Sequence, residues 1–145
     1  MNVQTILSAK GAEVATVTPS ATLAEAAEML RARGFGALVV SADGAGLDGI
    51  VSERDIVRAL AADGVATLER KIATCMSSEV FTCGPSDSID ALMSMMTERR
   101  IRHLPVIDGN RLAGMISIGD AVKYRLGELE RENDQLHDYI QGNVG

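Results

Sequence analysis

Two short motifs in the chain combine a serine with an aspartate three residues further on. Residues 49–55 read Gly-Ile-Val-Ser-Glu-Arg-Asp, and residues 114–120 read Gly-Met-Ile-Ser-Ile-Gly-Asp. A carboxylate can accept two hydrogen bonds from a vicinal diol such as that of a ribose. Free backbone N–H groups in the first turn of a helix also favour a phosphate. The sequence therefore offers two candidate nucleotide-binding pairs, Ser52 with Asp55 and Ser117 with Asp120.

The same spacing has a simpler interpretation, which the motifs alone leave open. Ser-x-x-Asp is also a capping box, in which each side chain accepts a hydrogen bond from the backbone of the other residue. Such boxes usually do no more than start a helix. Each motif is thus either a nucleotide cradle or a helix cap.

Positive charge that could meet a phosphate is distributed unevenly between the two halves. Arg102 and His103 lie just before an apolar run in the second half, and the matching positions of the first half carry no charge. Arg54 lies inside the first motif, where the second motif has Gly119. We therefore expect two clefts that are not equivalent. The alternatives are a solvated helix end at Arg99–Arg102, which complements the helix dipole, and an ordinary half-buried histidine.

The chain contains two copies of one unit, and each motif lies near the end of its copy. The fold of this unit must therefore position the motif residues. Residues 17–40 align without a gap with residues 83–106 at an offset of 66. Turn residues and apolar periodicity predict the order strand, helix, strand, strand, helix in each copy. The first copy has an extended stretch at 14–17, a helix that a Thr22-x-x-Glu25 capping box starts and Gly34 ends, strands at 37–40 and 50–51, and a helix at 53–62. The second has an extended stretch at 80–83, a helix with an apolar stripe at 89–96, strands at 104–107 and 112–116, and a helix from 118 to about 141.

Composition limits the class of protein. The chain has 145 residues, and a unit of about 60 residues buries too little surface to be comfortably stable alone, so the copies are expected to share a core. A net charge of −6 with 3% aromatic residues and no Trp argues against nucleic-acid binding. Two Cys without a CxxC motif and two His make a structural metal site unexpected. The chain shows neither an apolar run of about 18 residues nor a basic signal start, so we expect a cytoplasmic protein without membrane contact.

The order of elements and the repeated motif resemble the CBS (cystathionine β-synthase) domain. Two segments are similar in sequence to those of small stand-alone bacterial CBS pairs. They are Ser-Glu-Arg-Asp-Ile-Val at 52–57 and Ile-Arg-His-Leu-Pro-Val at 101–106. The resemblance implies an α/β (α+β) fold of tandem CBS domains, each β-α-β-β-α, packed with pseudo-twofold symmetry. The expected boundaries are domain 1 at 3–64, a linker at 65–76, domain 2 at 77–127, and a long last helix at 118–141.

The resemblance also implies a cleft on each side that can take AMP, ADP, ATP, NAD(H) or S-adenosylmethionine. The motif aspartate of the family holds the ribose hydroxyls, and each cleft draws on the segment before the other repeat. One cleft is then expected to combine Ser117 and Asp120 with the segment from Lys10 to Thr16, and the other Ser52 and Asp55 with the segment from Met76 to Val80. Arg54, Arg102 and His103 are the expected phosphate contacts.

The function that follows is regulatory. The sequence lacks a nucleophile elbow, a P-loop and a GxGxxG motif, so we expect no catalytic residues, no required cofactor and no enzyme activity. We expect a nucleotide-sensing CBS pair that acts through a homodimer and an unknown partner protein. The alternatives are a ligand-free dimerisation scaffold and, third, an enzyme that acts on a nucleotide.

The last predicted helix carries a heptad seam with one asparagine in it. The seam has spacings of 4, 3, 4, 3 and 4, and consists of Val122, Leu126, Leu129, Asn133, Leu136 and Ile140. An asparagine at such a position costs stability but can fix register and strand number. We favour packing across a homodimer, and the alternative is a terminal helix that lies back on its own domain.

Overall fold

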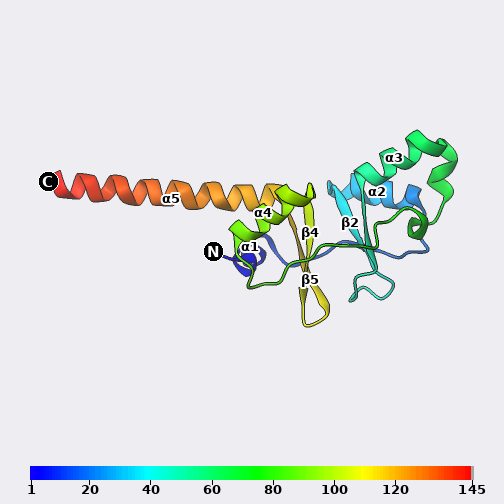
Figure 1. The fold of residues 1–145 in the computed structure, drawn as a ribbon, viewed down its shortest axis with the longest axis horizontal. Coiled ribbons are helices and arrows are strands. Elements are labelled where there is room, and N and C mark those ends of the chain that lie inside the picture. The colour runs from blue at the N-terminus through cyan, green and yellow to red at the C-terminus, as the bar shows by residue number, and fades with distance from the viewer. Residues whose placement is uncertain (145) are drawn as a thin grey trace.

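The computed structural model describes residues 1–144 of the chain. Figure 1 shows a body made of two halves that lie side by side, each with a small sheet and helices above it. The last helix, α5 (Ile118–Val144), leaves this body as a long single rod. The chain therefore separates into a repeated body and a projecting tail.

The first repeat is a three-stranded sheet with two helices. Strand β2 (Ala37–Val40) lies in the middle, parallel to β1 (Thr16–Val17) and antiparallel to β3 (Gly49–Ser52). Helix α2 (Leu23–Arg33) follows β1, and helix α3 (Glu53–Asp63) follows β3. All four residues of β2 are buried, as expected for a short apolar strand in the centre of a sheet. The predicted β-α-β-β-α order is confirmed here.

The second repeat follows the same course. Helix α4 (Ile89–Arg99) leads into the antiparallel pair β4 (His103–Asp108) and β5 (Arg111–Ser117), and α5 begins directly after β5. One predicted element differs, because residues 80–83 form no strand among the described residues. Only Cys83 pairs, through an isolated parallel bridge to Val106.

Pro105 explains the missing strand. The Val39 N–H of the first repeat donates to the Ala15 carbonyl at 3.3 Å and extends the β1–β2 ladder. At the repeat offset of 66, the equivalent donor is Pro105, which has no N–H. The ladder therefore stops at Cys83, which keeps one bond on each side of the bridge.

The helix ends agree with the predicted repeat except at two points, the start of α2 and the end of α4. The Thr22 hydroxyl accepts from the Glu25 N–H at 3.2 Å, but Glu25 makes no return bond to the described residues, so half of the predicted capping box forms. Gly34 ends α2 in the left-handed region at φ 68°, as predicted. The equivalent end of α4 is Arg100 at φ 54°. A residue with a side chain pays roughly 1–2 kcal/mol for this conformation.

The two repeats exchange segments. Helix α1 (Val3–Lys10) precedes the first repeat, yet it packs in the core of the second repeat, where Ile6 is fully buried. Ile72, in the short 3₁₀ helix η2 (Ile72–Thr74) before the second repeat, is fully buried in the core of the first. The predicted boundaries had placed α1 in the first domain and Ile72 in a linker. Each repeat is too small to bury a sufficient core alone, and the preceding segment of the other copy completes it.

The glycine that opens each motif allows this exchange. A Cβ added at Gly114 would lie 2.5 Å from Leu7 Cδ2 of α1. A Cβ added at Gly49 would lie 2.7 Å from Met76 Sδ, just after η2. A Cβ at Gly49 would also lie 2.7 Å from the Ser77 carbonyl oxygen, so the backbone would have to move, whereas a Cβ at Gly114 would require the buried Leu7 side chain to shift.

The linker between the repeats and the last helix differ slightly from the predictions. The segment expected as a linker at 65–76 contains two 3₁₀ turns, η1 (Val65–Glu69) and η2. Helix α5 continues to Val144, a few residues past the predicted end. No helix within residues 1–144 is long and apolar enough to cross a membrane.

Substitution of Ile6 tests the exchange. Ile6→Ala removes a fully buried side chain from the second core, so we expect the free energy of unfolding to fall by about 2–5 kcal/mol in urea titrations. Val65→Ala is the control, because Val65 is 77% exposed and its loss should change stability by no more than about 0.5 kcal/mol. Equal stabilities of the two variants would contradict the packing of α1 in the second core.

Candidate functional site

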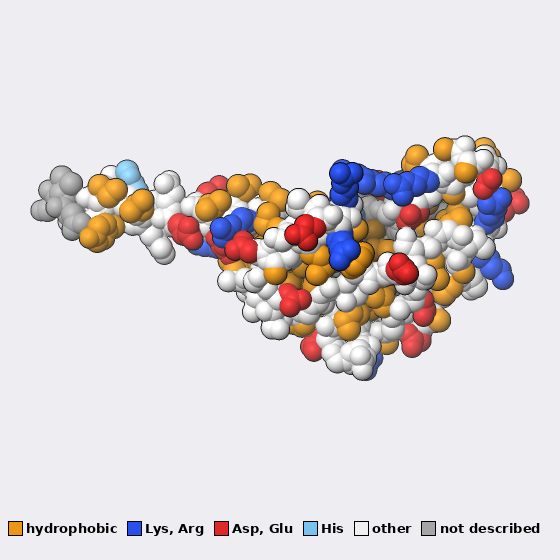
Figure 2. All heavy atoms as spheres, in the orientation of Figure 1, with side chains coloured by type: hydrophobic (Ala, Val, Ile, Leu, Met, Phe, Trp, Pro, Cys, Tyr) orange, Lys and Arg blue, Asp and Glu red, His pale blue; other side chains and the backbone are white. Residues whose placement is uncertain are grey.

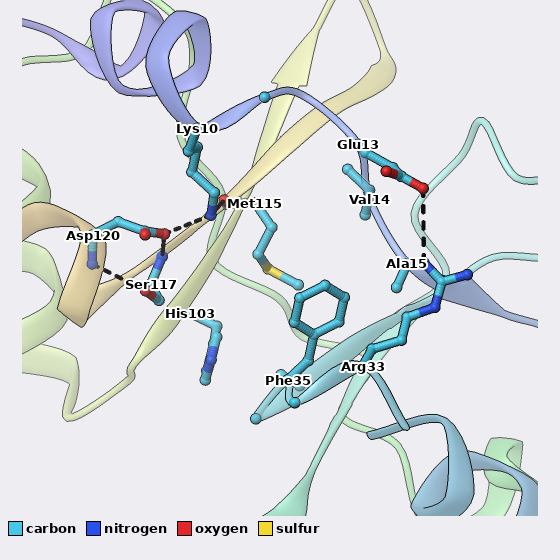
Figure 3. A pocket seen from close by; sticks show the side chains of 14 residues that line it. Lys10, Glu13, Val14, Ala15, Arg33, Phe35, His103, Met115, Ser117 and Asp120 are labelled. Atoms are coloured by element: carbon cyan, nitrogen blue, oxygen red, sulfur yellow. Dashed lines mark hydrogen bonds and ion pairs between the residues drawn. The ribbon is translucent and has the colours of Figure 1, made fainter. Parts of the chain in front are cut away.

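A cavity of about 460 Å³ opens where the two repeats meet the end of α1. We call it the Lys10 cleft (Figure 3). The second repeat contributes the start of β4, the end of β5 and the first turn of α5, and the first repeat contributes the turn after α2. The lining consists of Lys10, Gly11, Glu13, Val14, Ala15, Arg33, Gly34, Phe35, Gly36, Ala37, His103, Met115, Ser117 and Asp120.

Asp120 is the most constrained side chain of this cleft. Its Oδ2 accepts from the Ser117 N–H at 2.9 Å, and its own N–H donates to Ser117 Oγ at 3.1 Å, so the capping box forms. Lys10 Nζ lies 2.6 Å from the same Oδ2 and 2.9 Å from the Met115 carbonyl. Oδ1 accepts no hydrogen bond from the described residues. One carboxylate oxygen is therefore committed to the fold, and the other is available to a ligand.

The surroundings keep Asp120 ionised. Burial raises the pKa of its carboxyl, but the hydrogen bonds and charge of Lys10 and the bonds from Ser117 outweigh this, and the pKa lies below its usual range. A carboxylate in this state can accept hydrogen bonds from a diol, and it holds the Lys10 ammonium group in the cleft.

His103 lies between two cavities at the start of β4. Burial lowers the pKa of its imidazole, the charges of Asp120 and Glu53 oppose the shift, and Lys10 and Arg102 support it. A Cβ added at Gly36 would lie 3.1 Å from His103 Cε1, so a larger residue at position 36 would displace the imidazole ring. His103 is thus a mostly neutral donor or acceptor at the junction of the repeats.

A second cavity, of about 310 Å³, lies on the other side of this junction. We call it the arginine cleft. Its capping box also forms, with Asp55 Oδ2 accepting from the Ser52 N–H at 2.8 Å and from Ser52 Oγ at 3.0 Å. Its lining consists of Gly36, Ala37, Ile50, Ser52, Glu53, Arg54, Asp55, Arg58, Ser77, Arg100, Ile101, Arg102 and His103.

The structure distributes the predicted site residues over these two cavities. Lys10, Ser117 and Asp120 line the first, Ser52, Asp55, Arg54 and Arg102 line the second, and His103 lines both. Three predicted residues line neither cavity. Thr16 pairs with Val39 in the sheet, and Met76 packs against the first core. Val80 lines neither cavity, and Ser77 is the residue of the segment from Met76 to Val80 that lines the arginine cleft.

Sequence reasoning missed Phe35, which points into the Lys10 cleft near Met115 (Figure 3). Its side chain is 42% exposed, the same fraction as that of Phe81, the other phenylalanine of the chain. Phe35 lies between Gly34, which ends α2, and strand β2, so it belongs to the apolar pattern of neither element. An aromatic residue outside both patterns was the sequence signal that could have identified it. Arg33, 3.7 Å from Glu13, was missed as well.

The arrangement can bind but offers no prepared nucleophile. Ser117 Oγ accepts the Asp120 N–H, and no hydrogen bond among the described residues joins it to His103. No group of three or more His, Cys, Asp or Glu side chains that could hold a metal ion occurs within the described part of the chain.

Two α/β repeats that exchange segments and enclose a cleft on each side define a tandem two-repeat module. The chain matches the CBS domain model at residues 9–62 and 70–127, and it belongs to the CBS domain family. It is 36% identical to the mitochondrial CBS domain-containing protein CBSX3 of Arabidopsis thaliana over 86% of this chain, and it spans 63% of that protein.

Solved structures agree with the fold. The CBS-domain protein ATU1752 of Agrobacterium tumefaciens is 45% identical, with a TM-score of 0.82 over 86% of this chain and 92% of that one. The CBS domain pair of MJ0100 is 25% identical, with a TM-score of 0.77 over 88% of this chain and 98% of that one. The MJ0100 pair was crystallised in complex with 5′-methylthioadenosine and S-adenosyl-L-methionine.

Substitution of Lys10 tests the ion pair. Lys10→Met introduces the residue found at the equivalent position 76, and we expect a loss of about 0.2–1 kcal/mol in the free energy of unfolding at pH 7. The lowered pKa of Asp120 means that its contribution is complete above the ordinary aspartate pKa of about 3.9 and is lost as pH falls through the folded-state pKa. The difference from wild type should therefore begin to shrink below about pH 4 and close as the pH falls past the lowered pKa of Asp120.

Lys71→Met serves as the matched control in these urea titrations. Lys71 is exposed and forms no ion pair with the described residues. A difference between wild type and Lys10→Met that persisted unchanged at pH 3 would contradict an ion pair as its cause.

Proposed function

We propose that the protein is a regulatory module that binds an adenosine-containing ligand in the Lys10 cleft. One observation carries the proposal. A carboxylate oxygen of Asp120 is free in a cavity of about 460 Å³ that an exposed aromatic ring, Phe35, enters from the other repeat. The free oxygen suits a ribose diol, and the ring with Met115 suits the face of a purine.

Lys10 and His103 complete the cleft for a ligand that carries a phosphate or another polar group. Lys10 Nζ lies between the Asp120 carboxylate and the Met115 carbonyl, and it can turn toward an anion without leaving the cleft. Candidates are AMP, ADP, ATP, NAD(H) and S-adenosylmethionine. The adenosine compounds bound by the MJ0100 pair support the class but do not choose among its members.

Regulation would follow from the origin of the cleft walls. Asp120 belongs to the second repeat and Phe35 to the first, so a ligand that contacts both stabilises one relative placement of the repeats. A ligand shifts such an equilibrium only by its differential affinity for the two states. A partner protein that recognises the favoured state would read the ligand.

A ligand-free scaffold is the second candidate, and the two complete capping boxes favour it. Both aspartates already have a structural task in starting α3 and α5. The scaffold explains these bonds but gives no reason for the open cavity or for Phe35.

Thermal melting separates the two candidates. Adenosine, AMP, ATP, NADH and S-adenosylmethionine are each added to the full chain; at 100-fold above the dissociation constant a ligand adds about 2.7 kcal/mol, or about 5–10 °C in Tm. Asp120→Asn should reduce the shift, because a neutral amide is a weaker acceptor for the diol. Asp108→Asn, at the exposed end of β4, should leave the shift intact.

Each other outcome has a defined meaning. Absence of a shift with every compound would support the scaffold and reject the sensor. Turnover of a compound during incubation, followed by chromatography, would identify an enzyme.

We also propose a homodimer through α5. The seam residues are exposed in the single chain, with Leu126 at 54%, Leu136 at 57% and Ile140 at 53%. A second copy would cover the same seam, and Asn133 would face its own counterpart in a parallel pair. Charges at the flanking positions agree with this orientation, since Arg125 would approach Glu130 of the other copy. Arg125 also pairs with Glu128 on its own helix.

Light scattering on seam variants tests the dimer. Leu136→Asp places a charge in the seam, so we expect the measured mass to fall from twice the chain mass toward the single chain. Gln135→Asp adds the same charge beside the seam and should leave the dimer intact. Truncation after Gly127 should act like Leu136→Asp, and an unchanged dimer in both cases would reject the role of α5.

A further inference from the structure

The segments that lead into the two repeats differ in one residue. Residues 13–16 read Glu-Val-Ala-Thr, and residues 79–82 read Glu-Val-Phe-Thr at the same offset of 66. Ala15 lines the Lys10 cleft, and its equivalent in the second segment is Phe81. A phenyl ring thus stands in the second segment where the first has a methyl group.

Equivalent backbone hydrogen bonds hold the two segments. The Val17 carbonyl accepts from the Ser41 N–H at 2.9 Å, and the Cys83 carbonyl accepts from the Ile107 N–H at 2.8 Å. The differing residue precedes each of these carbonyls by two positions. The two repeats therefore present a methyl group and a phenyl ring from the same place in the fold.

The Phe81 ring is covered by an arginine. The Arg99 Cζ lies 4.7 Å from the centre of the ring, which is a cation–π contact. The equivalent arginine of the first repeat, Arg33, lines the Lys10 cleft and lies 3.7 Å from Glu13 (Figure 3). Arg99 forms no ion pair with any described residue. The equivalents of two residues that line the first cleft thus contact each other on the second side.

This contact also stabilises Arg99 among other cations. Figure 2 shows Lys and Arg side chains gathered along the upper edge of the body, where the end of α4 approaches α3. Arg99 is the last residue of α4. The negative face of an aromatic ring attracts a guanidinium group and offsets repulsion from neighbouring cations. An attraction therefore holds the Phe81 ring in place.

The two cavities differ as this contact leads us to expect. The Lys10 cleft has a volume of about 460 Å³, and the arginine cleft has about 310 Å³. Residues 13–15 and Arg33 line the first, whereas the equivalent residues 79–81 and Arg99 do not line the second. Asp55 still lines the second cavity, so the capping-box aspartate is present there and the wall from the preceding segment is not.

We infer that the Phe81–Arg99 contact closes the arginine cleft to a nucleoside, so that each chain takes one nucleoside, in the Lys10 cleft. A protein can exclude a ligand by placing bulk where that ligand would lie, and a phenyl ring takes up space that a base needs. Phe81 is thus a specificity-determining residue. The inference rests on the proposed function for the class of ligand, and on the repeat comparison for the closure.

Calorimetric titration with adenosine counts the open clefts in the full chain. Adenosine is uncharged, so the arginines of the second cleft cannot hold it by charge alone. We expect one adenosine per chain in wild type and two in Phe81→Ala, which introduces the residue found at position 15. Phe81 is 42% exposed and belongs to neither core, so its truncation leaves both cores intact. Asp55→Asn, added to Phe81→Ala, should weaken the second site alone.

Phe81→Tyr is the matched control, because it keeps the ring and should bind one adenosine as wild type does. Two adenosine molecules per chain in wild type or in Phe81→Tyr would overturn the inference and leave the proposed function standing. A single adenosine in both wild type and Phe81→Ala would do the same. Binding that appears only in Phe81→Ala would reject the proposed function while the closing role of Phe81 stands. Absence of binding in every variant would reject both.

Discussion

The buried side chains of Ile6 and Ile72 hold the two repeats together, since each completes a hydrophobic core that belongs mainly to the other repeat. The cause is size: a repeat of about 60 residues cannot bury enough surface alone. Because α1 must reach the second core, the chain after it passes between the repeats, and Lys10 arrives beside Asp120. Likewise, the chain after η2 passes β3, where the Ser77 and Ile50 backbones exchange hydrogen bonds at 3.0 Å. Both clefts are consequences of this exchange.

Equivalent positions of the two repeats carry different residues, and the two clefts therefore differ in lining. At an offset of 66, Lys10 corresponds to Met76, which packs in the first core and leaves Asp55 without a lysine. Phe35 corresponds to Ile101, so among the described residues a phenyl ring lines the Lys10 cleft and none lines the arginine cleft. The fold thus supplies two similar frames, and single substitutions decide the charge and shape of each.

Local signals in the sequence predicted the elements well. Apolar periodicity, the Gly34 turn and the Ser-x-x-Asp motifs correspond to helices and strands within a few residues of their observed bounds. The errors have one physical origin, which is that partners far apart in the chain decide the outcome. The absent strand at 80–83 depends on Pro105, and the place of α1 depends on the core it fills.

Site prediction met the same limit. Lys10 and Asp120 are 110 residues apart, and no periodicity brings them together; only the resemblance to a family placed them near one cleft. Phe35 and Arg100 carry no motif, and they became visible through exposure and backbone conformation. The sequence did indicate unequal clefts, because equivalent positions of the two repeats carry different charged residues.

The position of Asp120 links the candidate site to the tail. Asp120 lies in the first turn of α5, and the exposed seam begins at Val122 on the same helix. A ligand that replaced Lys10 at Asp120 would release the contact between α1 and α5, so the helix start could shift relative to the second core. If a second copy holds the other end of α5, such a shift would be transmitted to the partner chain as a change in its orientation. The ion pair, rather than the cavity as a whole, is then the element whose two states a ligand and a dimer would both bias.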